Sequence, residues 1–400
     1  MTQTSAVAPQ RPITITDVRI WNGVTDSYLE NADAVRIENG RISAIGGTRE
    51  LSDGAQLHAG DGKTVLPGLI DAHVHLCLNP GIREALAQGQ ESQAELQRLI
   101  ADRCLEMVRA GITSARDLGG GTWDELVIRD RILAGELVGP RLVCSGQPIT
   151  SVHGHCHFWG GEAADVHAAL DVLERQIAKG VDLIKVMATG GSLTPGSTPS
   201  MSQFDAATLT SIVERATQHG RHVAAHCHGT QGIGYAAQAG VTTIEHCSWV
   251  GPAGWGMDYD EQVAAAIAAR GVWISPTINA GWKRNIGRTD FEARVRDNYR
   301  RMREAGIKLI ASTDAGIPNV LHHHLPLALP VFAHFANLTP AEALRSATSD
   351  CATAIGIGPQ TGRIDVGMSA DLLLVDGDVL ADLGVLENPV QVWARGVAVL

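Results

Sequence analysis

The two ends of the chain share one pattern, in which apolar and polar positions alternate. The alternation runs through residues 34–45, where Asn39 and Gly40 separate two apolar–polar runs and predict a β-hairpin. A similar pattern without helical periodicity returns at residues 362–378 and 390–400. We therefore predict that both ends pair in space as one small β-sandwich.

The middle of the chain alternates short apolar runs with segments of helical periodicity, which predicts βα units around a parallel sheet. The eight predicted strands are residues 69–76, 112–119, 141–147, 183–189, 222–228, 242–248, 272–278 and 308–314. The clearest predicted helices are residues 94–110, 164–180, 205–220 and 261–271. Eight strands, each followed by a helix, predict an α/β fold of the (β/α)8 TIM-barrel type. The predicted domains are a barrel over residues 66–359 and a β-sandwich over residues 1–65 plus 360–400.

Composition and charge narrow the class of protein. Hydrophobic residues make up 44% of the 400 residues, which is enough for a large core, and the net charge of −11 opposes binding to nucleic acid or an anionic membrane. The first residues lack a secretory signal, and the seven scattered cysteines show no CxxC spacing. We expect a cytoplasmic homo-oligomer that acts on a small-molecule substrate.

Side chains that bind metals fall at the ends of the predicted strands, where barrel enzymes carry their working residues. His73 and His75 end the first strand, and residues two apart point the same way, so both imidazoles can reach one ion. The candidates on the fourth, fifth, sixth and eighth strands are, in this order, Lys185, His226, His246 and Asp314. One His-x-His pair means little among 16 histidines, but the coincidence on five strands predicts a metal centre.

The motifs around these residues resemble the amidohydrolase superfamily. They read LPGLIDAHVHL, DLIKVMATGG, VAAHCHG, TIEHC and STDAG. Within the superfamily the chain is most similar to the branch of imidazolonepropionase-like proteins and Xaa-Pro dipeptidases. The segments SARDLGG and LTPAEALRSATSDCATAIGI indicate that branch.

The resemblance implies two divalent metal ions, and a set of histidines and carboxylates suits zinc, with manganese, cobalt or iron as alternatives. The more buried ion would be held by His73, His75 and Asp314, and the outer ion by His226 and His246. The bridging ligand would be Lys185, because a buried neutral amine can add CO2 and the resulting N-carboxylate is stabilised by two cations.

The resemblance also implies a mechanism of amide hydrolysis. A hydroxide bridging the two ions would attack the carbonyl, with Asp314 as general base and then general acid. His246 and His153 are the other candidate catalytic residues. The branch often has Gly-Gly-His after the third strand, and His153 takes its third position, where it would hydrogen-bond the substrate carbonyl oxygen. Val152 replaces the second glycine.

Other side chains are candidates for binding the substrate, namely His155, Trp159, His228 and His322. His228 stands where dipeptidases of the branch often have a tyrosine for the substrate α-carboxylate, which leaves dipeptide specificity open. A solvated loop is the alternative for residues 322–324. At the end of the second strand, Arg116 and Asp117 are expected to form a buried, structural ion pair.

The predicted function is hydrolysis of an amide bond in a dipeptide or N-acyl amino acid. The same binuclear site would also suit a cyclic amide, a lactone or a carbamate. Imidazolonepropionases themselves fit poorly, because that group works with one metal and lacks the lysine. A non-catalytic scaffold is disfavoured because every expected ligand position is filled.

Overall fold

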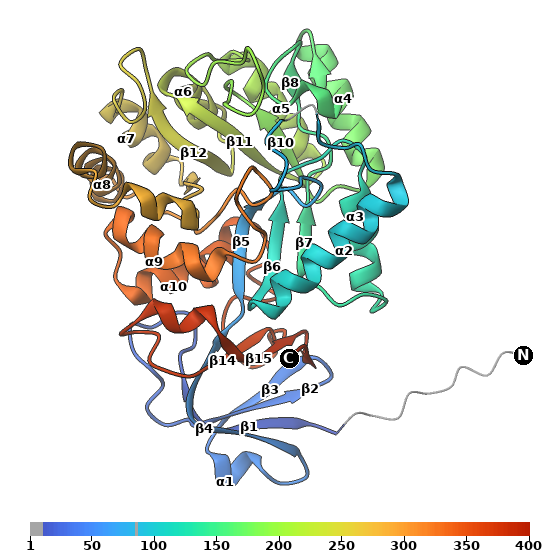
Figure 1. Cartoon of the computed structure of the whole chain (residues 1–400), viewed down its shortest axis with the longest axis vertical. Coiled ribbons are helices and arrows are strands. Elements are labelled where there is room, and N and C mark those ends of the chain that lie inside the picture. The colour runs from blue at the N-terminus through green and yellow to red at the C-terminus, as the bar shows by residue number, and fades with distance from the viewer. Residues whose placement is uncertain (1–10, 85–86) are drawn as a thin grey trace, which may run out of the picture.

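The computed structural model describes residues 11–84 and 87–400, and its central part is an α/β fold (Figure 1). Seven strands form two parallel sheets. The first sheet contains β5 (Leu69–Val74), β6 (Ile112–Asp117) and β7 (Arg141–Cys144). The second contains β10 (Leu183–Met187), β11 (His222–Gly229), β12 (Thr243–Val250) and β13 (Trp273–Ser275). These strands are almost wholly buried, as apolar runs covered on both faces must be.

Backbone hydrogen bonds link the two sheets through two extended segments. After β7, the N–H of Ile149 donates to the carbonyl of Lys185 on β10 at 2.9 Å. After β13, the N–H of Ile310 donates to the carbonyl of Ile274 at 2.9 Å, and the carbonyl of Ala311 accepts from β5 at 3.2 Å. The ends of all these strands therefore face one region of the molecule.

The eighth predicted strand, residues 308–314, is present as an extended segment with isolated bridges rather than as a regular strand. A side chain interrupts the backbone pairing with β5 there, because Asp71 accepts from the backbone N–H of Thr313 at 3.1 Å and from its hydroxyl at 2.6 Å. Asp314 follows with a positive φ of 60°, which turns the chain out of the strand. The predicted location was correct, and the predicted regularity was wrong.

Helices pack around the outside of the sheets (Figure 1). They are α2 (Gln93–Arg109), α3 (Asp124–Leu133), α4 (Val166–Lys179), α5 (Ala206–Gln218), α6 (Thr230–Ala239), α7 (Glu261–Ala269), α8 (Thr289–Glu304), α9 (Leu325–Ala336), α10 (Pro340–Ser346) and α11 (Ser349–Ala354). In α4 the side chain of Asp165 caps the start, Gly180 ends the helix, and the buried positions recur three and four residues apart. The four helices predicted from periodicity are confirmed. Among the helices of the described part, none combines the length and apolar character that crossing a bilayer requires.

Short elements complete the rim of the sheets. After β7 come β8 (Thr150–Ser151), the 3-10 helix η2 (His157–Trp159) and β9 (Glu162–Ala163). After β13 comes the 3-10 helix η3 (Ala280–Asn285), which leads into α8. These loops carry several of the side chains discussed below.

The strands of the two chain ends meet in one sheet below the central part (Figure 1). Its order is β16 (Val397–Ala398), β15 (Pro389–Ala394), β14 (Leu372–Val375), β4 (Gln56–Pro67), β1 (Ile13–Ile20), β2 (Ala34–Glu38) and β3 (Arg41–Gly46). A β-sandwich was expected, but the long β4 pairs with both β1 and β14 and joins the strands into one sheet. The predicted hairpin is confirmed, since Asn39 and Gly40 turn between β2 and β3 with φ of 50° and 76°.

Candidate metal centre

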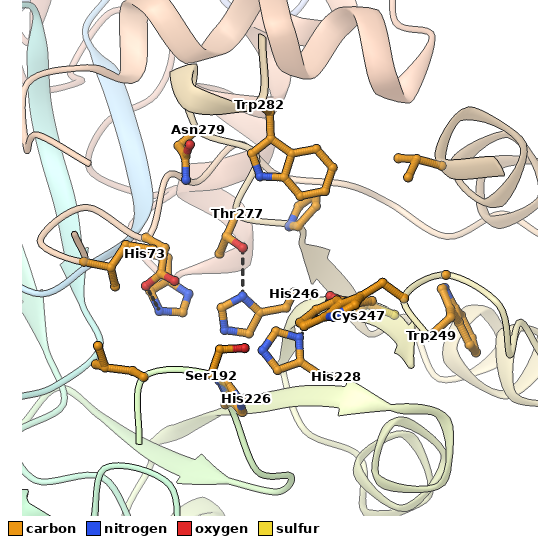
Figure 2. A pocket seen from close by; sticks show the side chains of 18 of the residues that line it. His73, Ser192, His226, His228, His246, Cys247, Trp249, Thr277, Asn279 and Trp282 are labelled. Atoms are coloured by element: carbon orange, nitrogen blue, oxygen red, sulfur yellow. Dashed lines mark hydrogen bonds and ion pairs between the residues drawn. The ribbon is translucent and has the colours of Figure 1, made fainter. Parts of the chain in front are cut away.

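The side chains predicted to bind metals meet around one cavity of about 640 Å³. All six line it, namely His73, His75, Lys185, His226, His246 and Asp314. Figure 2 shows the imidazoles of His73, His226 and His246 gathered in this pocket, although they come from β5, β11 and β12. Residues separated by more than a hundred positions in sequence are therefore neighbours at the strand ends.

His73, His75 and Asp314 present three donor atoms to one point. The Nε2 atoms of the two histidines lie 3.2 Å apart, and Oδ1 of Asp314 lies 3.3 Å from the first and 3.4 Å from the second. Ligand atoms about 2.0–2.1 Å from a tetrahedral zinc ion are separated from one another by about 3.3 Å. The spacing therefore fits a metal ion at the centre of the three atoms.

A second group of donors lies beside the first. Donor atoms of His226, His228 and His246 all lie within 4.8 Å of one another. The Nε2 of His226 contacts the carbonyl of Gly190 at 3.0 Å, which leaves its Nδ1 available. The Nδ1 of His246 contacts the hydroxyl of Thr277 at 2.8 Å, which leaves its Nε2 available. The imidazoles therefore fit a second ion.

His73 and His75 are held in the orientation that a metal ligand needs. The Nδ1 of His73 lies 2.9 Å from Oε2 of Glu245, and the Nδ1 of His75 lies 2.9 Å from the carbonyl oxygen of Gly119. Both partners accept, so each Nδ1 donates its proton and each Nε2 turns its lone pair to the cavity. Burial also lowers the pKa of His73 to about 4, which keeps that imidazole neutral at pH 7.

Glu245 is a candidate positioning residue that the sequence analysis did not identify. Besides His73, its carboxylate accepts from Nη2 of Arg116 at 2.8 Å, and both side chains are buried. Burial alone would raise the pKa of Glu245, but Arg116 and His73 lower it below the ordinary value, so the carboxylate stays charged. The sequence did contain a signal for Glu245, namely a carboxylate inside an apolar strand. A charge in such a place requires a buried partner.

The predicted ion pair between Arg116 and Asp117 was wrong. Consecutive residues of a strand point to opposite faces, so the two side chains of β6 diverge. Asp117 instead accepts from the backbone N–H groups of Leu76 at 2.7 Å and Gly119 at 2.8 Å. It thereby fixes the turn just beyond His75, on the opposite face from the Arg116–Glu245 pair.

Lys185 is buried on β10 with its side chain in the cavity wall. Within residues 11–84 and 87–400 its ammonium has neither a hydrogen bond nor an ion pair. Burial lowers its pKa to about 8, so about a tenth of this amine is neutral at pH 7, far more than for an exposed lysine. A neutral amine is the form that can add CO2, and this one lies beside the two groups of candidate metal ligands.

Asp314 remains a carboxylate in this environment. Burial alone would raise its pKa, but the adjacent His73 and His75 lower it below the ordinary value. For His226 and His246, burial is the main cause that lowers the pKa well below the ordinary value. Neutral imidazoles and an ionised carboxylate are the protonation states that bind metals.

The loop after β7 brings a different histidine to the cavity from the one predicted. The side chain of His153 is 85% exposed and faces Glu162, outside the cavity lining. His155 is buried in the lining instead, with its ring centroid 4.6 Å from that of His226. The prediction rested on the Gly-Gly-His pattern of the branch, whereas here a positive φ of 56° at His153 turns the backbone at that position. Gly191 allows the inward position, because a Cβ there would lie 2.5 Å from the His155 ring.

The remaining substrate-binding candidates divide into two groups. Trp159 and His228 line the cavity, and the Trp159 ring lies 5.3 Å from that of His75. His322 lies outside the lining and is buried, with its Nε2 at 3.0 Å from the carbonyl oxygen of His75. It therefore supports the end of β5 and does not face a substrate. His323, also predicted as part of a solvated loop, is half-buried beside a helix.

We expect Glu245→Gln to weaken both folding and metal binding. Removal of the charge leaves Arg116 buried without an ionic partner, a loss worth about 3–5 kcal/mol in unfolding free energy. The orientation of His73 is also lost, which typically costs 10- to 100-fold in metal affinity. Urea unfolding and zinc titration measure the two effects, and Glu304→Gln in the exposed pair with Arg300 is the matched control. Equal behaviour of the two variants would contradict the role given to Glu245.

Buried imidazoles, a carboxylate and a lysine at the strand ends of an α/β fold define a metal-dependent hydrolase. The model of the amidohydrolase family matches residues 64–399. The chain belongs to the amidohydrolase family, and it is an enzyme that hydrolyses carbon–nitrogen bonds.

Individual relatives agree with the branch indicated by the motifs. The ochratoxinase of Aspergillus niger is 26% identical over 371 residues, which cover 83% of this chain and 75% of the relative. The imidazolonepropionase of Chloroflexus aggregans is 27% identical over 408 residues, covering 92% and 90%. The crystal structure of a Xaa-Pro dipeptidase with methionine bound in its active site matches with a TM-score of 0.85 and 25% identity, covering 97% of this chain and 99% of the other. The predicted branch is confirmed.

Proposed function

We propose that this enzyme hydrolyses the amide bond of a dipeptide or an N-acyl amino acid with the help of two divalent metal ions. The observation that carries the proposal is the convergence of His73, His75 and Asp314, whose donor atoms lie 3.2 to 3.4 Å from one another. We further propose that the two sheets and their linking segments form a (β/α)8 barrel over residues 66–359. The terminal sheet, within residues 1–65 plus 360–400, would then be a separate small domain.

The chain offers ligands for two ions, and zinc suits them. The more buried ion would be held by His73, His75 and Asp314, and the outer ion by His226 and His246. Lys185, as an N-carboxylate, would contribute an anionic oxygen to each. When bound, two such cations polarise a carbonyl and lower the pKa of water.

Asp314 is the residue proposed to move the proton. Its side chain lines the cavity and is 15% exposed, so it is accessible to water and substrate. As a carboxylate of low pKa it accepts the proton of the attacking water and passes it to the leaving amine nitrogen. Transfer to nitrogen is favourable, because the expelled amine is far more basic than the carboxylate.

His155 is proposed to bind the carbonyl oxygen of the substrate in place of His153. Burial lowers the pKa of His155 to about 3, so its ring is neutral and one nitrogen carries a proton. Its Nδ1 is buried and, in the described part of the chain, has no hydrogen-bond partner. A buried donor beside His226 would therefore stabilise negative charge on that oxygen.

The relatives support amide chemistry. The names ochratoxinase, imidazolonepropionase and Xaa-Pro dipeptidase belong to hydrolases of this family. The variety of these names also indicates that loops, and not the metal centre, determine which leaving group is accepted.

A substrate panel tests the proposal. Purified enzyme loaded with zinc is assayed against dipeptides, N-acetyl amino acids, lactones and carbamates, by mass spectrometry of the products. We expect release of free amino acid from at least one amide class, and loss of that activity after removal of the metal with a chelator. Cleavage of lactones alone, with every amide left intact, would contradict the assignment.

A further inference from the structure

A separate cluster of metal-binding side chains lies outside the central cavity, on the loop that follows β7. Its members are His153, His157 and Glu162, and one donor atom from each lies within 4.8 Å of the others. None of the three lines the cavity of the candidate metal centre. Among the described residues, the other groups of three such donors belong to that cavity. The cluster is therefore a site of its own and not an extension of the central one.

Backbone pairing brings the three side chains of this cluster together. β8 and β9 pair in parallel, with Thr150 opposite Glu162. The backbone N–H of Thr150 also donates to the carbonyl of Gly161 at 2.9 Å. His153 follows β8, His157 begins η2, and Glu162 begins β9. The two ends of the loop are thus tied side by side, which places all three donors at one point of the surface.

The carboxylate of Glu162 is already oriented as a ligand would be. Its Oε1 accepts from the backbone N–H of His153 at 2.8 Å and lies 3.8 Å from the Nδ1 of the same residue. In the described part of the chain, its Oε2 has no hydrogen bond, and no lysine or arginine pairs with the carboxylate. A fixed carboxylate beside two imidazoles, without a competing basic side chain, is open to a metal cation.

The two imidazoles of the cluster are also free to bind. Their ring centroids lie 5.9 Å apart with the ring planes nearly perpendicular, and neither ring has a hydrogen bond to another described residue. Positive φ values of 56° at both His153 and Cys156 fold the chain tightly between them. Imidazole nitrogen is a ligand that zinc, copper and nickel favour.

We propose that His153, His157 and Glu162 bind one transition-metal ion, for which zinc is best suited, and that this ion clamps the loop. Two imidazoles and one carboxylate are a zinc ligand set, with water in the fourth position. Rotation of exposed side chains brings donors that now lie within 4.8 Å to the separation of about 3.3 Å that tetrahedral zinc requires. This site is independent of the proposed amide hydrolysis.

The clamped loop forms part of the wall of the central cavity. It carries His155 and Trp159, which both line that cavity. The ring of His157 lies 5.8 Å from that of Phe158, which lies 5.6 Å from that of Trp159, and Trp159 lies 5.3 Å from His75. An ion held by His157 therefore restrains η2 and, through it, the position of Trp159 beside the candidate metal centre.

The ion of this loop site is expected to be held more weakly than ions of the central cavity. The side chain of His153 is 85% exposed and that of Glu162 37%, so water competes for the ion and for its ligands. Zinc-loaded protein that is desalted into zinc-free buffer should keep its central ions and lose this one. Zinc added afterwards refills the loop site and counts it separately.

Calorimetric titration of the desalted protein with zinc tests the site. We expect one further ion per chain in the wild type. In His153→Ala and Glu162→Gln we expect binding at least about 100-fold weaker, because loss of a residue that only supports a metal ligand already costs up to about that much. His167→Ala is the matched control, since it removes an exposed histidine on α4 that belongs to none of the donor groups. It should bind zinc as the wild type does.

Hydrogen exchange measures the clamp. We expect zinc to slow the exchange of backbone amides at residues 151–161 in the wild type and not in His153→Ala. Zinc binding without slower exchange would overturn the clamp. Equal zinc binding by the wild type and His153→Ala would overturn the site, as would a zinc-soaked crystal without an anomalous peak at these three side chains. The expected difference is one ion whatever the central cavity holds, so either failure leaves the proposed function standing.

Discussion

Asp314→Asn lowers kcat for amide hydrolysis by at least about a thousandfold. General acid–base catalysis contributes effects of this size, and Asp314 is also a proposed metal ligand. The amide of asparagine fills the same space but cannot accept the proton of the attacking water. Because Oδ1 also lies 3.3 Å from the Nε2 of His73, the variant is expected to bind zinc more weakly. The measurement is kcat at saturating zinc, together with the zinc content of the same sample.

The matched control for this variant is Asp102→Asn. Asp102 is an exposed carboxylate on α2, paired with Arg98 and outside the cavity lining. It should retain full activity and an unchanged unfolding midpoint. If Asp314→Asn kept more than a tenth of the activity with zinc bound, Asp314 would not be the residue that moves the proton.

Lys185→Ala is expected to have the second large effect. Loss of the proposed bridging N-carboxylate removes a ligand from both ions. Loss of a residue that only supports a metal ligand typically costs up to about 100-fold, so we expect activity here to fall by more than that. Zinc content measured by plasma mass spectrometry should fall below two per chain. The fold should persist, because the amine has no hydrogen bond or ion pair to lose in the described part of the structure.

A rescue experiment separates the carboxylate role from simple packing. Lys185→Ala leaves a space in which acetate or formate can replace the missing carboxylate, whereas Lys185→Met fills that space with an apolar chain. We expect added acetate to restore part of the activity and zinc content of the alanine variant and none of the methionine variant. Full activity of either variant without added acid, with two zinc ions bound, would exclude the bridging role.

The positions of the candidate metal ligands could be predicted because strands constrain them. His73 and His75 are two residues apart at the end of β5, and the period of a strand places both on one side. Parallel strands then bring His226 and His246 to the same edge of their sheet, as the pairing of β11 with β12 shows. Hydrophobic pattern and strand direction were sufficient to predict that these side chains lie around one cavity.

The rest of the candidate site and of the fold depends on backbone conformation and on contacts between distant residues, which the sequence pattern does not reveal. In the loop after β7, a positive φ at His153 turns that side chain outward and leaves His155 inside. Glu245 acquires its role from Arg116 on another strand and His73 on a third, contacts that no local spacing specifies. The eighth strand is irregular where Asp71 accepts two hydrogen bonds from Thr313, a contact between a side chain and a distant segment that no local pattern specifies.

The central claim is that two metal ions lie among these side chains. The most direct test is a crystal structure of the zinc-loaded protein, with anomalous diffraction recorded at the zinc absorption edge. We expect two peaks about 3.5–4 Å apart. One should lie about 2.0–2.2 Å from the donor atoms of His73, His75 and Asp314, and the other should contact His226 and His246. A peak at neither place in zinc-loaded crystals would contradict the account.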